Sequence, residues 1–450
     1  MLRAIAKKIQ PLGGFPKKGN QSLKRRLIQG AIGSFGLKIA GSGLAFIVSM
    51  ILARVLGTIG LGTYAYAITW ANLLSIPATL GIDQLIVREI AIYRGKSDWE
   101  LMGGLLRWSN YIVLGTSLVL TLIATAVIWL FQGSFNQVVL AVLLAMTSIP
   151  LASLRNLRLG AMRGLDRIVL GQIPDSLLTP MIMIVSIILG YWFFPSNFGV
   201  FWVLSSKIFA VTITFLLGSI WLVRSLPKPV IQIKPQYLGK QWLFAALPFM
   251  FLGTIQLINS RIDIIMLGGI KGVAEVGIYT VIVGITQLTA FIHHATLGVL
   301  APTIATLYSE GKFKKLEKLI QQSALAVFFF SLLLGVIIMG FSKYLLLVFG
   351  REFVSGIIAM NILICGQIFN AFTGPVGLVL NMTGYQNQTA IATAISAVLN
   401  IMLNAILIPK WGINGAAIAT VTSIFAINII KVTMMQKKIG ISLYSLPKIY

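Results

Sequence analysis

The 450-residue chain is 57% hydrophobic and only 10% charged, with a mean hydropathy of +0.91. Soluble domains carry about 25% charged residues, so this composition excludes a surface built for water. The net charge of +25 would indicate nucleic-acid binding in a soluble protein, but here the basic residues lie between apolar runs, which indicates membrane topology and no nucleic-acid partner.

The chain begins with a basic segment, residues 1–26, that is rich in Gly and Pro and has no apolar core. This pattern is not that of a cleavable signal peptide, so we expect the first helix to serve as the insertion signal. Apolar runs then predict an all-α polytopic membrane protein with about twelve helices, each long enough to cross a hydrocarbon core of about 30 Å. The predicted spans are residues 29–55, 62–86, 106–131, 136–154, 168–193, 198–222, 241–267, 274–300, 320–340, 356–380, 388–408 and 413–434.

The Lys and Arg residues are distributed unequally between the two sides of these spans. Of the 36, 28 lie on the side of the chain termini, five lie on the other side and three lie inside spans. Basic residues concentrate on the cytoplasmic side of membrane proteins. The sequence therefore predicts a multi-pass protein of the cell (inner) membrane with both termini in the cytoplasm and an even number of spans.

Three short motifs recur in the same order at an offset of 211–220 residues. The matched pairs are residues 55–64 with 266–279, 92–96 with 307–312, and 161–164 with 381–384. Six spans per half predict two parallel, pseudo-symmetric lobes related by an axis along the membrane normal, with the substrate path between them. The predicted domains are the cytoplasmic segment 1–26, an N-terminal lobe 27–223, a cytoplasmic linker 224–240, a C-terminal lobe 241–436 and a cytoplasmic tail 437–450. Three prolines in the linker favour an extended segment without a helix.

Lys38 is the first candidate for a substrate-binding residue. It lies about ten residues into the first span, roughly 15 Å deep at ~1.5 Å per residue, which places it near the midplane. Ser42, Ala45 and Ser49 share its helix face and form a small, polar stripe. Because ionisable groups inside spans are costly, Lys38 is expected to face a cavity, although the stripe could also serve helix packing.

The seventh span carries four polar residues. Gln256, Asn259 and Asp263 share one face by their spacing of three and four, whereas Arg261 points elsewhere. Arg261 could hold a phosphate through bidentate hydrogen bonds, or it could form a structural ion pair with an acid on a neighbouring span. All four are candidates for the substrate cavity, and Asp263 is also a candidate for ion coupling.

Other ionisable residues within or at the ends of spans are weaker candidates. Lys207 in the sixth span is a further candidate for the cavity. Asp83 and Asp175 lie near the cytoplasmic boundary, where charge is less costly. His293 and His294 could titrate and couple transport to protons, although adjacent histidines point about 100° apart on a helix and packing is the alternative.

No enzyme signature is present in the sequence. Gly95-Lys96-Ser97 resembles the end of a phosphate-binding loop, but the position of the required earlier glycine is Ile90. The single cysteine, Cys365, excludes an intrachain disulfide and a Cys-based zinc site. We therefore expect a protein that is not an enzyme and needs no metal or cofactor.

Long stretches of the chain are similar to one known family. They are Ile51–Ala67, Gly81–Ala91, Pro248–Tyr279 and Phe349–Thr420. In their order and spacing they resemble the Wzx-type polysaccharide flippases of the multidrug/oligosaccharidyl-lipid/polysaccharide superfamily. The resemblance implies two six-helix lobes around a cavity that opens to each side in turn. It also implies that a polyprenyl-diphosphate-linked oligosaccharide is moved from the cytoplasmic to the outer leaflet, with polysaccharide polymerase machinery as a partner.

Positive charge in such a cavity suits a diphosphate, and Lys38 and Arg261 fit this role by their depth and charge. Three alternatives stay open. A drug or cation antiporter of the same superfamily would be expected to carry a carboxylate where the first span has Lys38. A membrane-embedded sugar polymerase or ligase would need larger outer loops. A lipid II flippase often carries additional helices.

Overall fold

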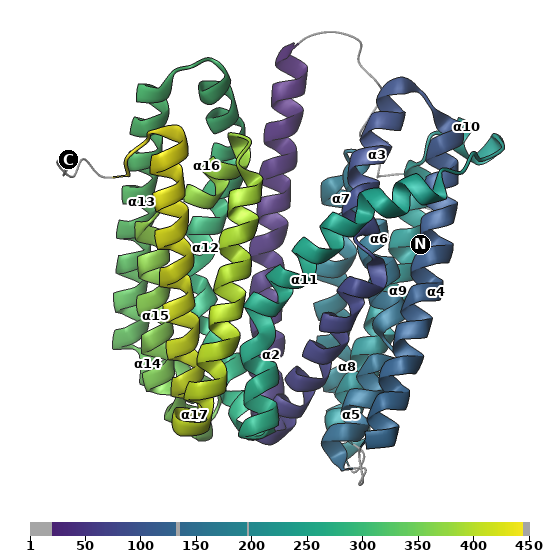
Figure 1. Cartoon of the computed structure of the whole chain (residues 1–450). Coiled ribbons are helices and arrows are strands. Elements are labelled where there is room, and N and C mark those ends of the chain that lie inside the picture. Colours follow the sequence, from purple (N-terminus) through teal and green to yellow (C-terminus); the bar gives the residue numbers. More distant parts are fainter. Residues whose placement is uncertain (1–19, 132–135, 196–197, 444–450) are drawn as a thin grey trace.

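The computed structural model describes residues 20–131, 136–195 and 198–443, which are almost entirely helical and contain no strand. The helices form two bundles side by side, and the bundles lie closer together at one end than at the other (Figure 1). The predicted all-α membrane fold is confirmed. Helix α2 begins and helix α17 ends at the same end of the molecule, the terminal end, and both are broken near the opposite end (Figure 1).

The first bundle contains the helices that precede residue 226. They are α2 (Asn20–Thr79), α3 (Ile82–Lys96), α4 (Trp99–Phe131), α5 (Gln137–Met146), α6 (Ile149–Gly164), α7 (Ile168–Ile173), the π-helical turn η1 (Pro174–Leu178), α8 (Thr179–Phe193) and α9 (Val200–Ser225). The short helix α10 (Lys228–Gln232) connects the bundles. The second bundle contains α11 (Gly239–Ile270), α12 (Val273–Ser309), α13 (Phe313–Gly340), α14 (Ser342–Phe349), the 3-10 turn η3 (Arg351–Gly356), α15 (Ile357–Phe372), α16 (Val376–Met382) and α17 (Gln386–Ile439).

Nine helices of the described residues are long and apolar enough to cross a membrane, or ten if α5 and α6, bent by 40° at their junction, count as one span. Two of the nine are each interrupted at a glycine, α2 at Gly57 (φ +65°) and α17 at Gly412 (φ +53°). A positive φ favours glycine because it has no Cβ. Both breaks fall between consecutive predicted spans. Reading α2 and α17 as two segments each agrees with the predicted pattern, and the count of twelve stays a prediction.

The linker between the bundles differs from its prediction. Residues 228–232 form the helix α10, so the expectation of a wholly extended segment was wrong. Pro227 precedes this helix and Pro229 lies in its first turn, where a missing backbone N–H is tolerated. The start of α11 is fixed to the first bundle, because Trp242 Nε1 donates to the Tyr93 hydroxyl at 2.9 Å.

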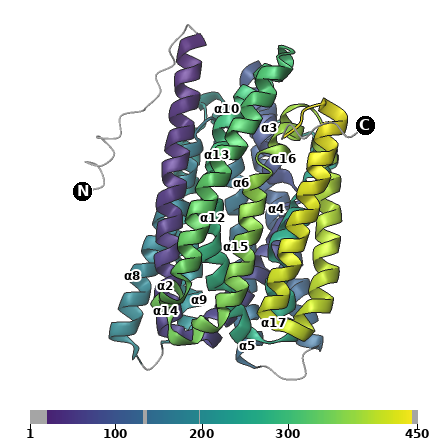
Figure 2. The same cartoon turned by 90° about the vertical axis from the view of Figure 1, so that its left-hand side faces the viewer.

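The two bundles meet through a reciprocal contact between two glycines. A Cβ added to Gly62 of α2 would lie 1.7 Å from the carbonyl oxygen of Val273, and one added to Gly277 of α12 would lie 2.1 Å from that of Thr58. Helices α2 and α12 lie alongside each other in both views (Figures 1 and 2). Thr58 and Val273, like Gly62 and Gly277, are 215 residues apart, so equivalent positions of the two halves contact each other.

The offset of 215 residues corrects the predicted match of residues 55–64 with 266–279. Gly57 was aligned with Gly268, but its structural counterpart is Gly272, which also has a positive φ, +93°, and directly precedes a helix. Chance similarity of the short motifs Val55–Gly57 and Met266–Gly268 produced the four-residue error.

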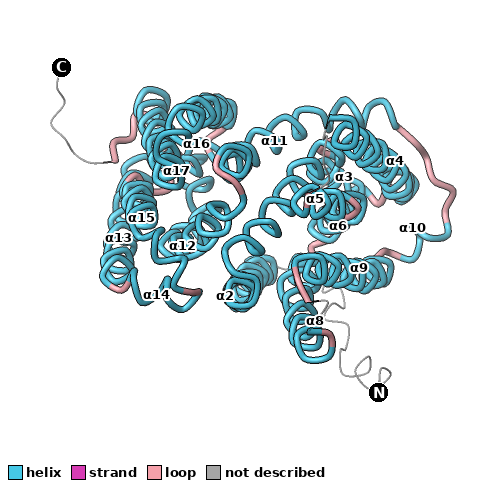
Figure 3. Tube along the Cα trace, turned by 90° about the horizontal axis from the view of Figure 1, so that it is seen from below, coloured by secondary structure: helices cyan, strands magenta, loops and turns pink. Residues whose placement is uncertain are grey.

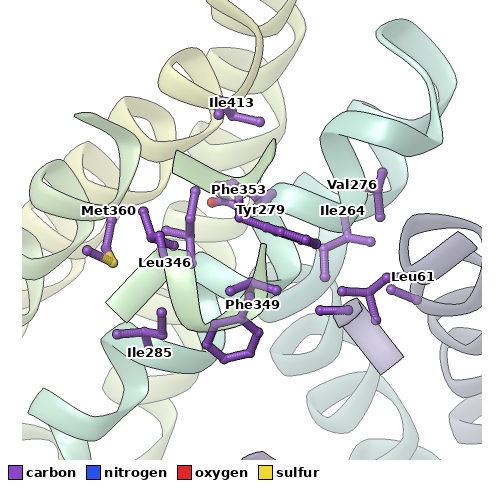
Figure 4. Close-up of a cluster of buried hydrophobic side chains, with 14 of the residues drawn as sticks. Leu61, Ile264, Val276, Tyr279, Ile285, Leu346, Phe349, Phe353, Met360 and Ile413 are labelled. Atoms are coloured by element: carbon purple, nitrogen blue, oxygen red, sulfur yellow. The ribbon is translucent and has the colours of Figure 1, made fainter. Parts of the chain in front are cut away.

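An apolar cluster fills the junction beside this contact. Leu61 of α2 packs with residues from α11, α12 and α14, among them Ile264, Tyr279 and Phe349 (Figure 4). All four are at most 2% exposed. The junction of the bundles is therefore a shared core, which positions α2, α11 and α12 around the space described next.

Candidate functional site

A cavity of about 510 Å³ lies between the bundles. Its wall is formed by both segments of α2, by η1 and α8, and by single turns of α9, α11 and α12. Most of the lining residues belong to the first bundle, and Arg261, Ile264 and Thr280 close it from the second. The cavity thus lies where a path between two lobes is predicted, and its use by a substrate stays a prediction.

All three basic residues that the sequence places inside spans line this one cavity. Lys38 comes from α2, Lys207 from α9 and Arg261 from α11, so three separate helices bring their cations together. Ser42, Ala45 and Ser49 line it as well, hence the polar stripe beside Lys38 faces the cavity. Among the described residues, none of the three cations is in a salt bridge with an acid within 4 Å.

The cations are staggered along the cavity. Lys38 lies about 28 Å along the α2 axis from the break at Gly57, at ~1.5 Å per residue. By the same measure Arg261 lies about 14 Å from the end of α11 and Lys207 about 10 Å from the start of α9. Lys38 is thus farther from the opposite end than Arg261 and Lys207, and it lies near the middle of the α2 segment between Asn20 and Gly57; its depth in the membrane stays a prediction.

One acid lines the cavity among the described residues, and it is held by two arginines. Asp175 lies on the π-helical turn η1. Its Oδ1 is 3.7 Å from Arg155 Nε, and its Oδ2 is 3.5 Å from Arg158 Nη2. Arg158 also donates from Nη1 to the carbonyl oxygens of residues 214 and 215 at 3.0 and 2.7 Å.

Sequence reasoning missed the two arginines of this cluster. Arg155 and Arg158 fall between the predicted spans 136–154 and 168–193, but both lie on α6, which continues to Gly164. Arg158 is only 4% exposed. The apolar run ends before the helix does, and hydropathy alone therefore assigned both to a loop.

Asp263 and its neighbours on α11 lie apart from the cavity. Asp263 is 7% exposed, and Asn259 Oδ1 accepts a hydrogen bond from Ser396 of α17 at 3.5 Å. Gln256 is exposed and does not line the cavity. Of the four residues Arg261 alone lines the cavity, while Asp263 and Asn259 lie within the second bundle.

Asp263 has polar neighbours inside the second bundle. Its Oδ1 accepts a hydrogen bond from the Ile264 N–H at 2.9 Å, and Tyr279 is another interaction partner. The Tyr279 hydroxyl oxygen also lies 3.4 Å from that of Thr420. On α17, Asn404 Nδ2 donates to Asn400 Oδ1 at 3.0 Å, and the buried Asn404 Oδ1 has no hydrogen-bond partner among the described residues. A buried carboxylate within a membrane-embedded bundle is a chemically suitable setting for a proton or a monovalent cation.

His293 does not line the central cavity. His293 is 9% exposed and has an interaction partner, while the side chain of His294 lies outside the described part of the structure. No group of three or more His, Cys, Asp or Glu that could hold a metal occurs among the described residues. Asp83 contacts Thr79 and Gln84 of its own region and does not line the cavity.

Two protein families match the chain. Residues 27–308 match the family described as "Polysaccharide biosynthesis protein", and residues 248–406 match the family MatE. A curated relative, the probable low-salt glycan biosynthesis flippase Agl15 of Haloferax volcanii, is 26% identical over 413 residues, which cover 89% of this chain and 82% of the relative. A second relative from that organism, the probable flippase AglR, is 28% identical over 185 residues, 40% of this chain and 38% of the relative.

Solved structures share the fold. An inward-facing multidrug resistance MATE family transporter of the MOP superfamily superposes with a TM-score of 0.71 at 17% identity, covering 91% of this chain and 98% of the transporter. The lipid II flippase MurJ in an inward closed conformation superposes with a TM-score of 0.68 at 16% identity, covering 91% of this chain and 87% of MurJ. At these identities the similarity concerns the fold alone.

Proposed function

The chain belongs to the polysaccharide biosynthesis protein family, and from this membership we propose that it is a flippase for lipid-linked oligosaccharide. Its cargo is a polyprenyl-diphosphate-linked oligosaccharide, moved from the cytoplasmic to the outer leaflet by alternating access for cell-surface polysaccharide biosynthesis. The observation that carries the proposal is the convergence of Lys38, Lys207 and Arg261 on one cavity between the bundles.

The charge of the cavity suits a diphosphate. Its one lining acid, among the described residues, is held by Arg155 and Arg158, so three cations remain for a ligand. Opposite charges attract more strongly in a membrane-embedded cavity than in bulk water, and Arg261 can bind phosphate oxygens in a bidentate manner. Because the cations are staggered, a diphosphate that leaves Lys38 can be taken up by Lys207 and Arg261 farther along the path.

The positive charge of the central cavity also favours a lipid-linked oligosaccharide flippase over a drug or cation antiporter. A drug or cation antiporter would have to hold a cation among three basic side chains, which costs free energy. A lipid II flippase would use the same diphosphate chemistry with a different saccharide, and it is the second candidate because MurJ shares the fold. An enzymatic role has no catalytic group to support it in the cavity, and the polymerase partner stays a prediction.

The membrane orientation is a further part of the proposal. Loops at the terminal end carry most of the Lys and Arg residues, so this end is proposed to face the cytoplasm. Fusions of a reporter to the C-terminus test it: a fluorescent protein, which folds in the cytoplasm, is expected to fluoresce, and an exported phosphatase is expected to be inactive. An active phosphatase at the C-terminus would reverse the orientation.

Transport is tested in proteoliposomes that contain a fluorescent polyprenyl-diphosphate oligosaccharide. The accessibility of the cargo to an impermeant quencher reports its exchange between leaflets. Lys38→Ala and Arg261→Ala are each expected to lower the exchange rate about tenfold or more, because each removes a charge-assisted contact to phosphate. Lys343→Ala is the matched control, since Lys343 is exposed and does not line the cavity.

Normal exchange in both cavity variants would remove the case for a cationic anchor. If the protein moved no lipid-linked sugar but carried a cationic dye along a proton or sodium gradient, the antiporter alternative would replace the proposal. Size-exclusion profiles of the variants are compared first, so that a loss of folding is not read as a loss of transport.

A further inference from the structure

A second cavity, of about 410 Å³, lies in the second bundle at the opposite end of the molecule. It is built where α11 turns into α12 and where α17 breaks. The residues that line it are Lys271, Glu275, Ile278, Ser355, Lys410, Trp411, Gly412, Ile413 and Asn414. None of them lines the central cavity.

Two lysines of this outer pocket are free to bind a ligand. Neither ammonium group has a hydrogen bond or an ion pair within the described residues, although Glu275 lines the same pocket. Lys271 and Lys410 are two of only five basic residues on this side of the sequence. Basic residues are disfavoured outside the cytoplasmic face, so their convergence on one pocket calls for an anionic partner.

Glu275 does not serve that partner role, because its carboxylate is engaged by the backbone. Its Oε2 accepts a hydrogen bond from the Ile413 N–H at 2.9 Å, at the start of the second segment of α17. A Cβ added to Gly412 would lie 2.6 Å from the same oxygen, so the glycine makes room for this contact. The carboxylate thus interacts with the positive end of a helix, and the two lysines leave the pocket with a net positive charge.

Two further residues indicate what kind of anion fits. Within the described part of the chain, the buried Asn414 Oδ1 has no hydrogen-bond partner, and the Ser355 hydroxyl, which donates to the Glu352 carbonyl oxygen at 2.9 Å, lines the same pocket. Trp411 is 55% exposed at the rim, the position in which tryptophan marks the headgroup level of a bilayer. A ligand with a phosphate for the lysines and a hydroxylated substituent for Asn414, at headgroup depth, matches all of these groups.

We propose that the outer pocket binds the phosphate of a lipid headgroup in the outer leaflet. Two sources present this chemistry: an anionic phospholipid of the bilayer, and the diphosphate of cargo that has left the central cavity. The second source rests on the proposed function, whereas the phosphate site itself does not. The volume of the pocket is in the range of ligand-binding cavities.

The test measures binding to the full-length protein in nanodiscs of zwitterionic lipid. The probes are a fluorescent short-chain phosphatidylglycerol and, separately, a short-chain polyprenyl diphosphate. The pocket variant is Lys271→Gln with Lys410→Gln, and the matched control is Lys343→Gln with Arg351→Gln, which removes the same charge from exposed residues outside the pocket. Both pairs are also measured on a background of Lys38→Ala and Arg261→Ala, in which the central cavity contributes least to the binding of the probes.

The pocket variant is expected to bind phosphatidylglycerol about tenfold more weakly than the control pair, on either background. Asn414→Asp is a second variant that adds a negative charge without a change of size, and it is expected to weaken binding in the same direction. Equal affinities of the pocket variant and the control pair for both probes would overturn the proposal. A difference with polyprenyl diphosphate alone would assign the site to cargo, and a difference with both probes would assign it to phospholipid headgroups in general.

The two probes distinguish a failure of the proposed flippase function from a failure of the outer phosphate site. If the protein flips no lipid-linked sugar, the phosphatidylglycerol arm still reports on the pocket. If the pocket variant binds like its control but transport depends on Lys38, the flippase stands and the outer site does not.

Discussion

Helix α11 separates two kinds of charge at the level of single residues. Arg261 faces the central cavity, while Asp263, two positions later, is buried against the second bundle. A carboxylate buried inside a membrane protein is costly unless it binds a proton, a cation or hydrogen-bond donors.

Asp263→Asn is therefore predicted to remove the dependence of transport on the coupling ion. The amide keeps the size of the side chain but cannot be charged, so a proton or cation bound there would lose its main partner. The rate of cargo exchange is measured against sodium concentration and against pH, and coupling of about 1–3 kcal/mol is expected to disappear.

Glu310→Gln serves as the control for Asp263, since Glu310 is an exposed carboxylate at the end of α12 and lines neither cavity. An ion dependence that survives in Asp263→Asn would place coupling elsewhere, and His293 would be the next residue to substitute.

The cavity residues could be predicted from the sequence only in part. Lys38, Lys207 and Arg261 stand out because a charge inside an apolar run is rare, and the structure brings all three to one cavity. Asn259 and Gln256 lie on the same helix and do not reach it. Helix periodicity gives the face that residues share, but it does not give the direction of that face relative to the other helices.

At the scale of elements, the contact between α2 and α12 depends on glycine. The backbones at Gly62 and Gly277 approach so closely that a methyl group on either would overlap a carbonyl oxygen. Gly62→Ala and Gly277→Ala are each predicted to destabilise the protein by about 1–3 kcal/mol, because the helices must separate to admit the methyl group. The midpoint of thermal unfolding in detergent measures the effect.

Gly115→Ala in α4 is the matched control for these variants, since no atom lies within 4 Å of its added Cβ. It is predicted to be neutral or slightly stabilising, as Ala is the better helix former. The double variant of Gly62 and Gly277 is predicted to cost less than the two single variants together, because one separation admits both methyl groups. Additive effects would mean that the two glycines do not share a contact.

Helix boundaries could be predicted from the sequence where a single residue determines the backbone conformation. Gly57 and Gly412 break long helices because each adopts a positive φ, and turns were predicted at both places. Helix ends outside the apolar runs were missed, as at α6, because hydropathy reports the hydrocarbon core and not the helix. The helix α10 was missed because its prolines lie in the one turn that tolerates them.

At the scale of the whole molecule, polar contacts hold the bundles together at the opposite end. Arg54 of α2 donates from Nε to the carbonyl oxygen of Val348 at 2.6 Å and from Nη2 to that of Leu347 at 2.8 Å. Glu352 accepts from Thr58 Oγ1 at 3.1 Å. Helix α14 lies beside α2 when the molecule is seen from this end (Figure 3). An opening between the bundles at this end requires these contacts to break.

Arg54→Gln is predicted to shift the population toward conformations that open at this end. Hydrogen bonds from a charged donor contribute about 1.5–3 kcal/mol, so the shift is about tenfold or more. Distances between spin labels placed across the two bundles on a background of Cys365→Ser measure the populations. Arg351→Gln is the control, and equal distance distributions in both variants would show that Arg54 does not hold the end closed.

The reciprocal glycine contact bears on the ancestry of the molecule. Gly62 of α2 approaches Val273 of α12, and the equivalent Gly277 of α12 approaches Thr58, the equivalent of Val273, in α2. Such an exchange of equivalent contacts is the pattern of an isologous interface in a twofold-symmetric dimer. Two identical half-length chains could make this contact without any change of sequence between them. A homodimer of such half-length chains is thus a physically competent forerunner, and fusion of the two copies would have freed α11 to evolve its arginine on only one side of the pore.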